Sequence, residues 1–400
     1  MMKLAEVLFP EVYDQNEKKL NDLRYNLAGN TSDWMLCLGA GVSISVGLPS
    51  WYQLIAKINA QLLPLEFSNS CQYKETDSEE SNAYIKGIEK FREALEWDEK
   101  FVKKMADAFE GKNWKIFHDI NVLEAAEYVR NFIEILSGTS DEKTETPCEL
   151  DNEINSTIND FIQKACSLSI NITDSDIKNK TLGAVGQLMK AENVPIFSAI
   201  TYNYDNLLEC YLREGCGCEE SKVHSFTKAD ELKDFGNNDG WNIYHVHGRI
   251  PVKSFKGEEM SESVILTETD YYEEERMNYS WVNIIQSYAI ARENLIFIGF
   301  SGTDYNFRRI IKYVNQDRMK EHDRYIFFAV DDIVKAIFSG EDDIEVAVKK
   351  MADGKGYSYE KLMINHLIYA QTLYWKKHGL TVIWTSISEL PEKINSLHKM

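Results

Sequence analysis

No stretch of this sequence contains the roughly 18 consecutive apolar residues that a membrane-spanning helix needs, so a membrane protein is not expected. The first residues also lack the apolar core of a signal peptide, because Glu6, Glu11 and Asp14 interrupt them. Positive charge is scarce: 44 Lys and Arg stand against 64 Asp and Glu, a net charge of −20. Direct nucleic-acid binding needs cations that neutralise phosphates, so it is not expected. These absences predict a cytoplasmic protein.

Cysteine is infrequent as well. The chain has seven, an odd number spread along its length, which is not the pattern of a secreted disulfide framework. The only close pair is Cys216 and Cys218, and no second pair follows to complete a tetrahedral zinc site. Reduced structural thiols are therefore expected, with no zinc or other metal.

Short apolar runs alternate with helical patterns over much of the chain. A hydrophobic content of 44% is typical of a globular protein. Alternating strands and helices predict an α/β fold, a Rossmann-like doubly wound parallel sheet with an inserted helical module. The strand-like runs are 34–38, 196–201, 243–246, 295–298, 325–330 and 380–384.

The same patterns predict the domain boundaries. Residues 1–30 are interpreted as an N-terminal helical preface of uncertain role. The Rossmann-like domain is expected over 31–60 and 191–400. Residues 61–190 carry few strand signals and a clear helical periodicity, as around Val122–Leu136, and are interpreted as a helical insertion.

Four segments follow strand ends, where parallel sheets bind ligands. The first is Gly39-Ala40-Gly41-Val42-Ser43. Its glycines let the main chain approach a phosphate, and Ser43 offers a hydroxyl. Ile44 stands where a dinucleotide-binding fingerprint has its third glycine, so a purely structural turn explains the segment nearly as well.

The second segment is Thr201-Tyr202-Asn203-Tyr204-Asp205. Asn203 and Asp205 are two residues apart at a strand end and can both bind a ribose or an ordered water. Taken alone, the segment favours an Asx-type turn in which Asp205 or Asn206 caps the helix that begins at Leu207.

The third segment is His245-Val246-His247-Gly248. Two-residue spacing in a strand places both imidazoles on one face, but no Cys, Asp or Glu nearby completes a metal site. We interpret His247 as a single acid–base group, since imidazole titrates near neutral pH. A hydrogen-bonded buried histidine is the preferred interpretation of His245.

The fourth segment is Ile298-Gly299-Phe300-Ser301-Gly302-Thr303-Asp304. Gly299 again allows close approach of the main chain, and Ser301 offers a hydroxyl. Asp304 is expected to cap the following helix.

The order of these four segments, GAGVS to GLPSW, then TYNYD, HVHG and GFSGTD, resembles the sirtuin-like superfamily over roughly 34–58 and 196–310. It is most similar to the bacterial antiphage-defence branch, and within that branch to the sirtuin subunit of sirtuin–HerA systems. The resemblance implies an enzyme that cleaves the nicotinamide–ribose bond of NAD⁺. It also implies a homo-oligomer and a HerA-type ATPase partner.

The resemblance also implies a role for each matching residue. Gly39, Ala40, Gly41 and Ser43 would contact the pyrophosphate and adjoining ribose, and Thr201 would also contact NAD⁺. Asn203 and Asp205 would hold the nicotinamide ribose and the attacking water, and His247 would be the general base. Gly299 and Ser301 would flank the adenosine ribose.

The sequence departs from protein-deacetylating sirtuins in two places. No cysteine follows Gly248, whereas deacetylases carry two zinc-binding pairs there. Gly47-Leu48-Pro49-Ser50-Trp51-Tyr52 also lacks the acid and the arginine of the corresponding deacetylase segment. Water is therefore the expected acceptor, which makes the expected activity that of an NAD⁺ glycohydrolase. An NAD-dependent lysine deacylase and a non-catalytic subunit that senses NAD⁺ or ADP-ribose are the alternatives.

Overall fold

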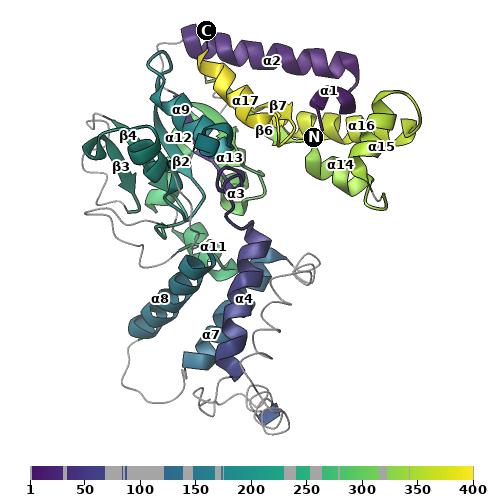
Figure 1. Ribbon diagram of the computed structural model, residues 1–400. Helices are drawn as coiled ribbons and strands as arrows, with labels where there is room; N and C mark the ends of the chain where they lie inside the picture. Colours follow the sequence, from purple (N-terminus) through teal and green to yellow (C-terminus); the bar gives the residue numbers. More distant parts are fainter. Residues whose placement is uncertain are drawn as a thin grey trace. The chain divides into compact units, whose positions relative to one another are not determined.

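The computed structural model describes two compact units of the chain (Figure 1). The first comprises residues 1–46, 170–246 and 278–400, and the second comprises 47–169 and 247–277. The residues that the structure describes are 2–29, 34–67, 83, 86–87, 121–137, 147–166, 173, 175–228, 240–252, 264–277, 280–314, 322–341 and 343–399. Most of 68–120, within the predicted insertion, lies outside these residues.

A seven-stranded sheet forms the core of the first unit, in the order β3-β4-β2-β1-β5-β6-β7. All of its described strand pairs are parallel, and helices flank it, which confirms the Rossmann-like α/β fold. The strands are β1 Trp34–Leu38, β2 Ile196–Thr201, β3 Val223–Phe226, β4 Trp241–His245, β5 Asn294–Ile298, β6 Arg324–Ala329 and β7 Thr381–Thr385.

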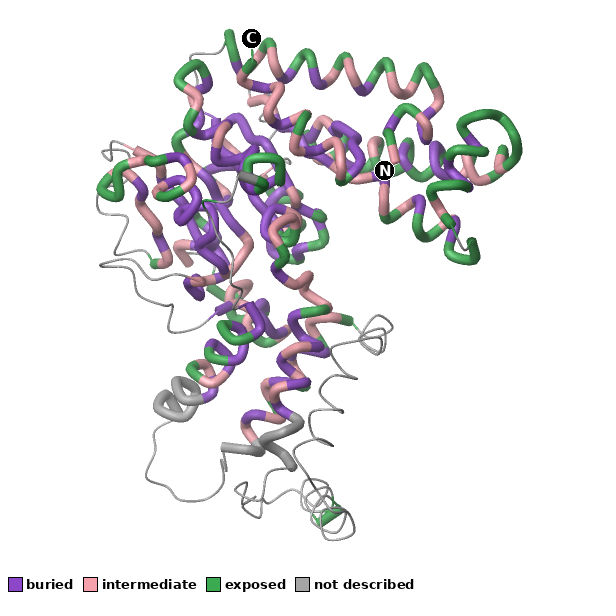
Figure 2. The backbone as a smooth tube through the Cα atoms, in the orientation of Figure 1, coloured by how far each residue is buried: buried purple, intermediate pink, exposed green. Residues whose placement is uncertain are grey.

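The buried central strands explain why the sequence shows continuous apolar runs there. Every residue of β1 and of β5 is buried, because parallel strands inside an α/β sheet are covered on both faces. Figure 2 shows the buried residues following the strands. The expected strands match the observed ones within two residues. The short β3 was missed, because only its two end residues, Val223 and Phe226, are buried.

The strand order creates a switch point beside β1. From β1 the chain passes to β2 on one side, and later to β5 on the other side. The carboxyl ends of these three strands are Leu38, Thr201 and Ile298, which lie level with one another in the two ladders. Ligands of open α/β sheets bind at such a point.

The first unit also contains the helices that flank the sheet. They are α1 Leu4–Val7, α2 Pro10–Gly29, α3 Ala40–Ile44, α9 Thr181–Lys190, α10 Leu207–Cys210, α12 Trp281–Arg292, α13 Tyr305–Val314, α14 Asp331–Ile337, α15 Ile344–Ala352, α16 Ser358–Lys377 and α17 Leu390–Asn395. Single turns of other helix types occur at Ser175–Asn179, Tyr211–Gly215, Glu220–Lys222 and Ser396–His398.

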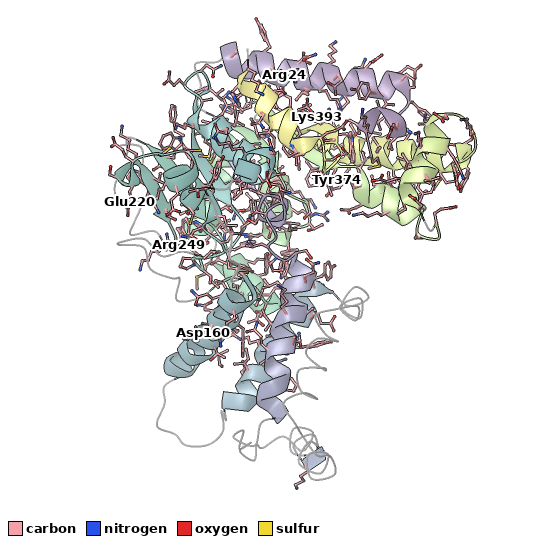
Figure 3. The ribbon with its side chains drawn as sticks, viewed as in Figure 1. Arg24, Asp160, Glu220, Arg249, Tyr374 and Lys393 are labelled. Atoms are coloured by element: carbon pink, nitrogen blue, oxygen red, sulfur yellow. The ribbon has the colours of Figure 1, made fainter. Side chains whose placement is uncertain are left out.

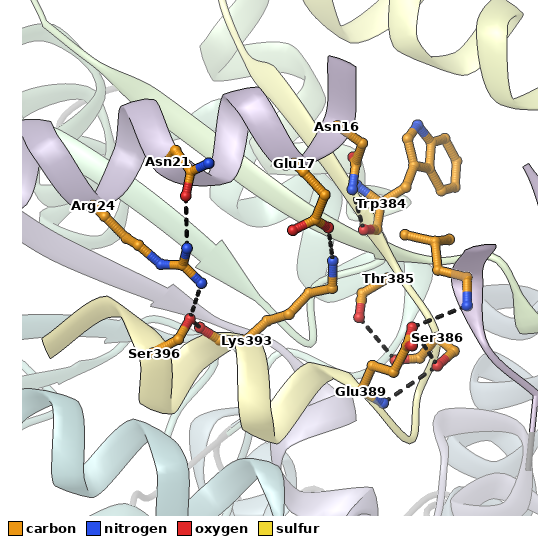
Figure 4. Close-up of polar contacts among 11 residues, drawn as sticks. Asn16, Glu17, Asn21, Arg24, Trp384, Thr385, Ser386, Glu389, Lys393 and Ser396 are labelled. Atoms are coloured by element: carbon orange, nitrogen blue, oxygen red, sulfur yellow. Dashed lines mark hydrogen bonds and ion pairs between the residues drawn. The ribbon is translucent and has the colours of Figure 1, made fainter. Parts of the chain in front are cut away.

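The N-terminal helix α2 is joined to the edge of the sheet. The Asn16 amide donates to the Trp384 carbonyl at 2.9 Å, and its oxygen accepts the Trp384 N–H at 2.6 Å (Figure 4). The Lys19 ammonium donates to the Val382 carbonyl at 3.0 Å. β7 is an edge strand, so these side chains take the place of a neighbouring strand.

Charged side chains join α2 to α17 in the same way. Lys393 forms an ion pair with Glu17 at 2.6 Å, and Arg24 donates to Ser396 at 2.6 Å (Figures 3 and 4). The predicted N-terminal preface therefore packs within the first unit.

The second unit is built around helices α4 Trp51–Phe67, α7 Val122–Ser137, α8 Pro147–Cys166 and α11 Glu268–Arg276. Ser50 precedes α4 and caps it, because its hydroxyl accepts the Gln53 N–H at 3.4 Å. Glu127 on α7 accepts the Thr269 N–H at 3.2 Å, which connects α11 to α7. Compared with the predicted boundaries, 170–190 falls with the sheet, because α9 is buried beside β2, and 247–277 falls with the helices.

Candidate functional site

The side chain of Asn203 joins two of the predicted segments at the switch point. Its amide donates to the main-chain oxygen of Gly39 at 3.1 Å and to the Ser43 hydroxyl at 3.0 Å. A carbonyl oxygen can only accept, so the nitrogen of the amide must face Gly39. Both amide protons are then used, and the Asn203 Oδ1 is the atom of this side chain that can accept a bond from a ligand.

Ser43 connects Asn203 to Asp205 by hydrogen bonds. Its hydroxyl accepts from Asn203 and donates to the Asp205 carboxylate, and both Ser43 and Asp205 are buried. Burial raises the pKa of Asp205 above its ordinary range, although the hydrogen bonds from Ser43 and from the Leu207 N–H oppose the shift. The predicted residues Ser43, Asn203 and Asp205 therefore meet in one chain of hydrogen bonds.

Asp205 also caps the helix that follows it. Its Oδ1 accepts the Leu207 N–H at 3.1 Å, at the start of α10. The Asx-type interpretation of this segment is therefore confirmed. The main chain of Asn203 is fixed from the other side, because its N–H donates to the Thr201 hydroxyl at 3.1 Å.

The glycines of the first and fourth segments allow two loops to touch. A Cβ on Gly39 would lie 2.6 Å from the Gly299 oxygen, and one on Gly41 would lie 2.8 Å from the Gly299 Cα. Gly299 itself has a φ of +63°, which disfavours other residues. These positions require glycine for packing, whatever they bind.

Main-chain donors at this turn are largely used within the protein. The Gly39 N–H donates to the Ile298 oxygen at 3.1 Å, and the Gly41 N–H donates to the Gly299 oxygen at 2.9 Å. Exposed Ala40 is the first residue of α3, where an N–H has no acceptor within the helix.

The fourth segment presents one exposed hydroxyl and one cap. Ser301 is exposed, and its hydroxyl lies 2.6 Å from that of Thr303. The buried Asp304 accepts the Phe307 N–H at 2.7 Å, which confirms that it caps α13.

His247 is the first residue of the second unit. It is buried, and its Nε2 lies 3.5 Å from the Tyr271 hydroxyl, with the two rings 5.7 Å apart in an edge-on arrangement. Its main-chain oxygen accepts the Ile265 N–H at 3.0 Å. That the His247 imidazole and the Asn203 amide act at one site stays a prediction.

His245 is a buried histidine with partners on both ring nitrogens, as expected. Its Nε2 lies 2.6 Å from the Glu209 carboxylate, and both side chains are at most 1% exposed. Sequence reasoning missed Glu209. The available signal was a lone carboxylate within the apolar run Leu207–Leu212, which needs a buried partner.

Two further observations concern metals and membranes. Among the described residues, no group of three His, Cys, Asp or Glu side chains is placed to hold a metal ion. Within the same part of the chain, no helix is both long and apolar enough to span a bilayer.

Comparison with known proteins identifies a related domain in part of the chain. Residues 198–347 match the model of the SIR2-like domain. The chain carries a SIR2-like domain. The matched residues of this chain include the segments of Asn203, His247 and Gly299. They begin after the Gly39–Ser43 turn, which lies outside the match.

A curated relative gives a second comparison. The chain is 30% identical over 135 residues to defense-associated sirtuin 2 of Bacillus subtilis. This match covers 33% of the present chain and 12% of the relative, so it spans about an eighth of that protein.

Proposed function

We propose that this chain is an NAD⁺ glycohydrolase that releases nicotinamide from NAD⁺. The observation that carries the proposal is the hydrogen-bonded chain of Asn203, Ser43 and Asp205 at the switch point of the sheet. The SIR2-like domain and the resemblance of four successive segments to sirtuin-like proteins support the same substrate.

The proposed reaction adds water across one bond. The bond between the ribose anomeric carbon and the nicotinamide nitrogen breaks, and its electron pair leaves with nicotinamide. The oxygen of water bonds to the anomeric carbon and loses one proton, so the products are ADP-ribose, nicotinamide and a proton. Positive charge develops on the ribose during this step, and fixed oxygen dipoles stabilise it.

Each residue has a role in this proposal. The Asn203 Oδ1 accepts a bond from the attacking water or a ribose hydroxyl, since its amide nitrogen is held by Gly39 and Ser43. Asp205 acts through Ser43, which fixes the Asn203 rotamer. His247 takes up the proton as general base.

The remaining predicted residues would bind the substrate. Ala40 would contact the pyrophosphate and Ser301 the adenosine ribose, which the start of α3 at Ala40 and the exposure of the Ser301 hydroxyl support. Gly39, Gly41 and Gly299 keep the two loops close enough to form this rim, and Thr201 holds the loop of Asn203.

The test is nicotinamide release from NAD⁺ by purified wild-type, Asn203→Ala and His247→Ala proteins. Removing an acid–base group should lower the rate about 10²–10⁴-fold. Asn193→Ala and His366→Ala are matched controls, because both residues are exposed and neither belongs to the four segments. Unchanged turnover in both site variants contradicts the assignment. Tight binding of NAD⁺ without hydrolysis would favour a sensing subunit, and acceleration by an acyl-lysine peptide would favour a deacylase.

We further propose that the activity serves antiphage defence and is gated. The name of the Bacillus subtilis relative supports the role in defence. Uncontrolled hydrolysis would deplete the NAD⁺ of the cell that makes the enzyme. Gating would come from homo-oligomerisation or from a HerA-type ATPase. Turnover measured over a range of protein concentrations, with and without such an ATPase, tests this idea, and a fully active monomer contradicts it.

A further inference from the structure

A buried polar pair lies directly behind the proposed catalytic amide. His245 is the last residue of β4 and is fully buried. Its Nε2 lies 2.6 Å from the Glu209 Oε1 on α10, and its Nδ1 lies 3.4 Å from the main-chain oxygen of Asn203. The Ser225 hydroxyl donates to the same Glu209 oxygen at 2.7 Å. The pair thus connects two strands and a helix to the residue that carries the amide.

The partners determine where the protons lie. The Asn203 oxygen can only accept, so the Nδ1 of His245 must carry a proton. Burial opposes ionisation of Glu209, but the interactions with His245 and Ser225 outweigh burial and lower the pKa of Glu209. One proton lies between Nε2 and the Glu209 oxygen, whose separation is 2.6 Å. Both ring nitrogens of His245 are therefore held by hydrogen bonds, one to Glu209 and one to the main-chain oxygen of Asn203.

A buried pair of this kind is not the most stabilising way to fill a core. Taking ionisable groups out of water is costly, and apolar residues of similar volume usually stabilise a core at least as well. The pair instead provides directed bonds. Asn203 is then held at three points: its N–H by Thr201, its side chain by Gly39 and Ser43, and its main-chain oxygen by His245.

We infer that His245 and Glu209 are positioning residues that aim the Asn203 amide, an inference that rests on the proposed function of Asn203. Glu209 fixes the orientation of the imidazole, and the imidazole fixes the main-chain oxygen of Asn203. The pair touches neither substrate nor water in this role. A small displacement of the amide would therefore reduce turnover without removing a substrate contact.

Two substitutions of His245 separate the two bonds of its ring. A glutamine amide nitrogen falls near the place of Nε2, so His245→Gln keeps a donor to Glu209 and loses the donor to Asn203. An asparagine amide nitrogen falls near the place of Nδ1, so His245→Asn keeps the donor to Asn203. Combining it with Glu209→Gln removes the carboxylate charge that would otherwise be buried without its partner.

The experiment compares steady-state nicotinamide release by wild type, His245→Gln and the double variant His245→Asn/Glu209→Gln. For His245→Gln we expect kcat to fall about 10²-fold, the cost typical of a misplacement near 1 Å, while KM for NAD⁺ changes little. The double variant should keep kcat within several-fold of wild type. If the pair were purely structural, His245→Gln would instead keep a higher kcat than the double variant, because it keeps the bond between β4 and α10.

A second measurement does not depend on turnover. In protein labelled with ¹⁵N-asparagine, the Asn203 side-chain protons should be protected from exchange with solvent in wild type and in the double variant, and exposed in His245→Gln. A His245→Gln protein with wild-type kcat and a protected amide overturns the inference. Loss of both properties in the double variant alone overturns it as well. Wild-type protein without turnover at any protein concentration, with and without a HerA-type ATPase, contradicts the proposed function, and the amide signal then still decides whether the pair positions Asn203.

Discussion

The Asn203 amide donates to the Ser43 hydroxyl at 3.0 Å, although 160 residues separate the two in the sequence. The bond joins the loop after β2 to the turn after β1, on neighbouring strands of the sheet. Because Ser43 also donates to Asp205, one hydroxyl orders both polar residues of the second segment. Several measurable consequences depend on this connection.

Ser43→Ala removes the acceptor of Asn203 and the donor of the buried Asp205. A buried polar group that loses its partner costs about 1–3 kcal/mol, so the free energy of unfolding should fall by that amount. Nicotinamide release should fall with it, since the amide is no longer held. Urea denaturation measures the first effect. Ser301→Ala is the control: its exposed hydroxyl should change stability by less than about 0.5 kcal/mol. Equal stability of the two variants would show that the Ser43 network contributes little.

Gly41→Ala tests the contact between the two loops. The added Cβ would lie 2.8 Å from the Gly299 Cα, where no flexible side chain can give way. Overpacking of this kind costs about 1–3 kcal/mol. Gly29→Ala at the end of α2 is the matched control, because a Cβ there meets nothing within 4 Å. Thermal unfolding of both variants decides the point. If Gly41→Ala melts like Gly29→Ala, the close approach is not a constraint.

Asp304 is expected to act as a helix cap and not as a ligand. Asp304→Ala should lower the free energy of unfolding by about 0.5–2 kcal/mol, because the Phe307 N–H loses its acceptor. Asp304→Asn keeps an oxygen in the same place and should cost only a few tenths of a kcal/mol. KM for NAD⁺ should be unchanged in Asp304→Asn. A large rise in KM in that variant would indicate that the carboxylate contacts the substrate.

The lowered pKa of Glu209 leads us to expect that the stability of the protein depends on pH. Its pKa is lower in the folded protein than the ordinary value of 4.5, so its stabilising contribution is complete above 4.5 and is lost as pH falls through the folded value. The melting temperature of wild type should exceed that of Glu209→Gln near pH 7, and the difference should shrink below about pH 4.5. Thermal scans between pH 7 and 4 measure it. A difference that grows on acidification would have the wrong sign for a carboxylate stabilised by His245.

Local sequence patterns predicted most of the sheet and both caps. β1 was evident because a strand buried on both faces is apolar at every position, and it ends at glycine. Asp205 and Asp304 cap helices through bonds to residues two and three positions away, which a sequence displays directly. β3 escaped prediction because two of its four residues are only half-buried.

Long-range contacts were harder to predict. Glu209 is buried against a histidine 36 residues away, and the sequence around Leu207–Cys210 does not identify that partner. The helix over 181–190 shows its apolar character in the sequence, but not that it packs beside β2. The glycines were expected to admit a phosphate, which stays a prediction, and the structure shows that they also admit another loop. Composition alone does not distinguish these two reasons for a missing side chain.

The bonds from Asn16 and Lys19 to the outer side of β7 also limit how copies of this protein can associate. A strand from another molecule that paired with β7 would have to displace the Asn16 amide from Trp384 and the Lys19 ammonium from Val382. Fibre-like growth by adding strands is therefore disfavoured at this end of the sheet. Any higher assembly through this region has to be built from helix surfaces, whose side chains can be altered one at a time without disturbing the sheet.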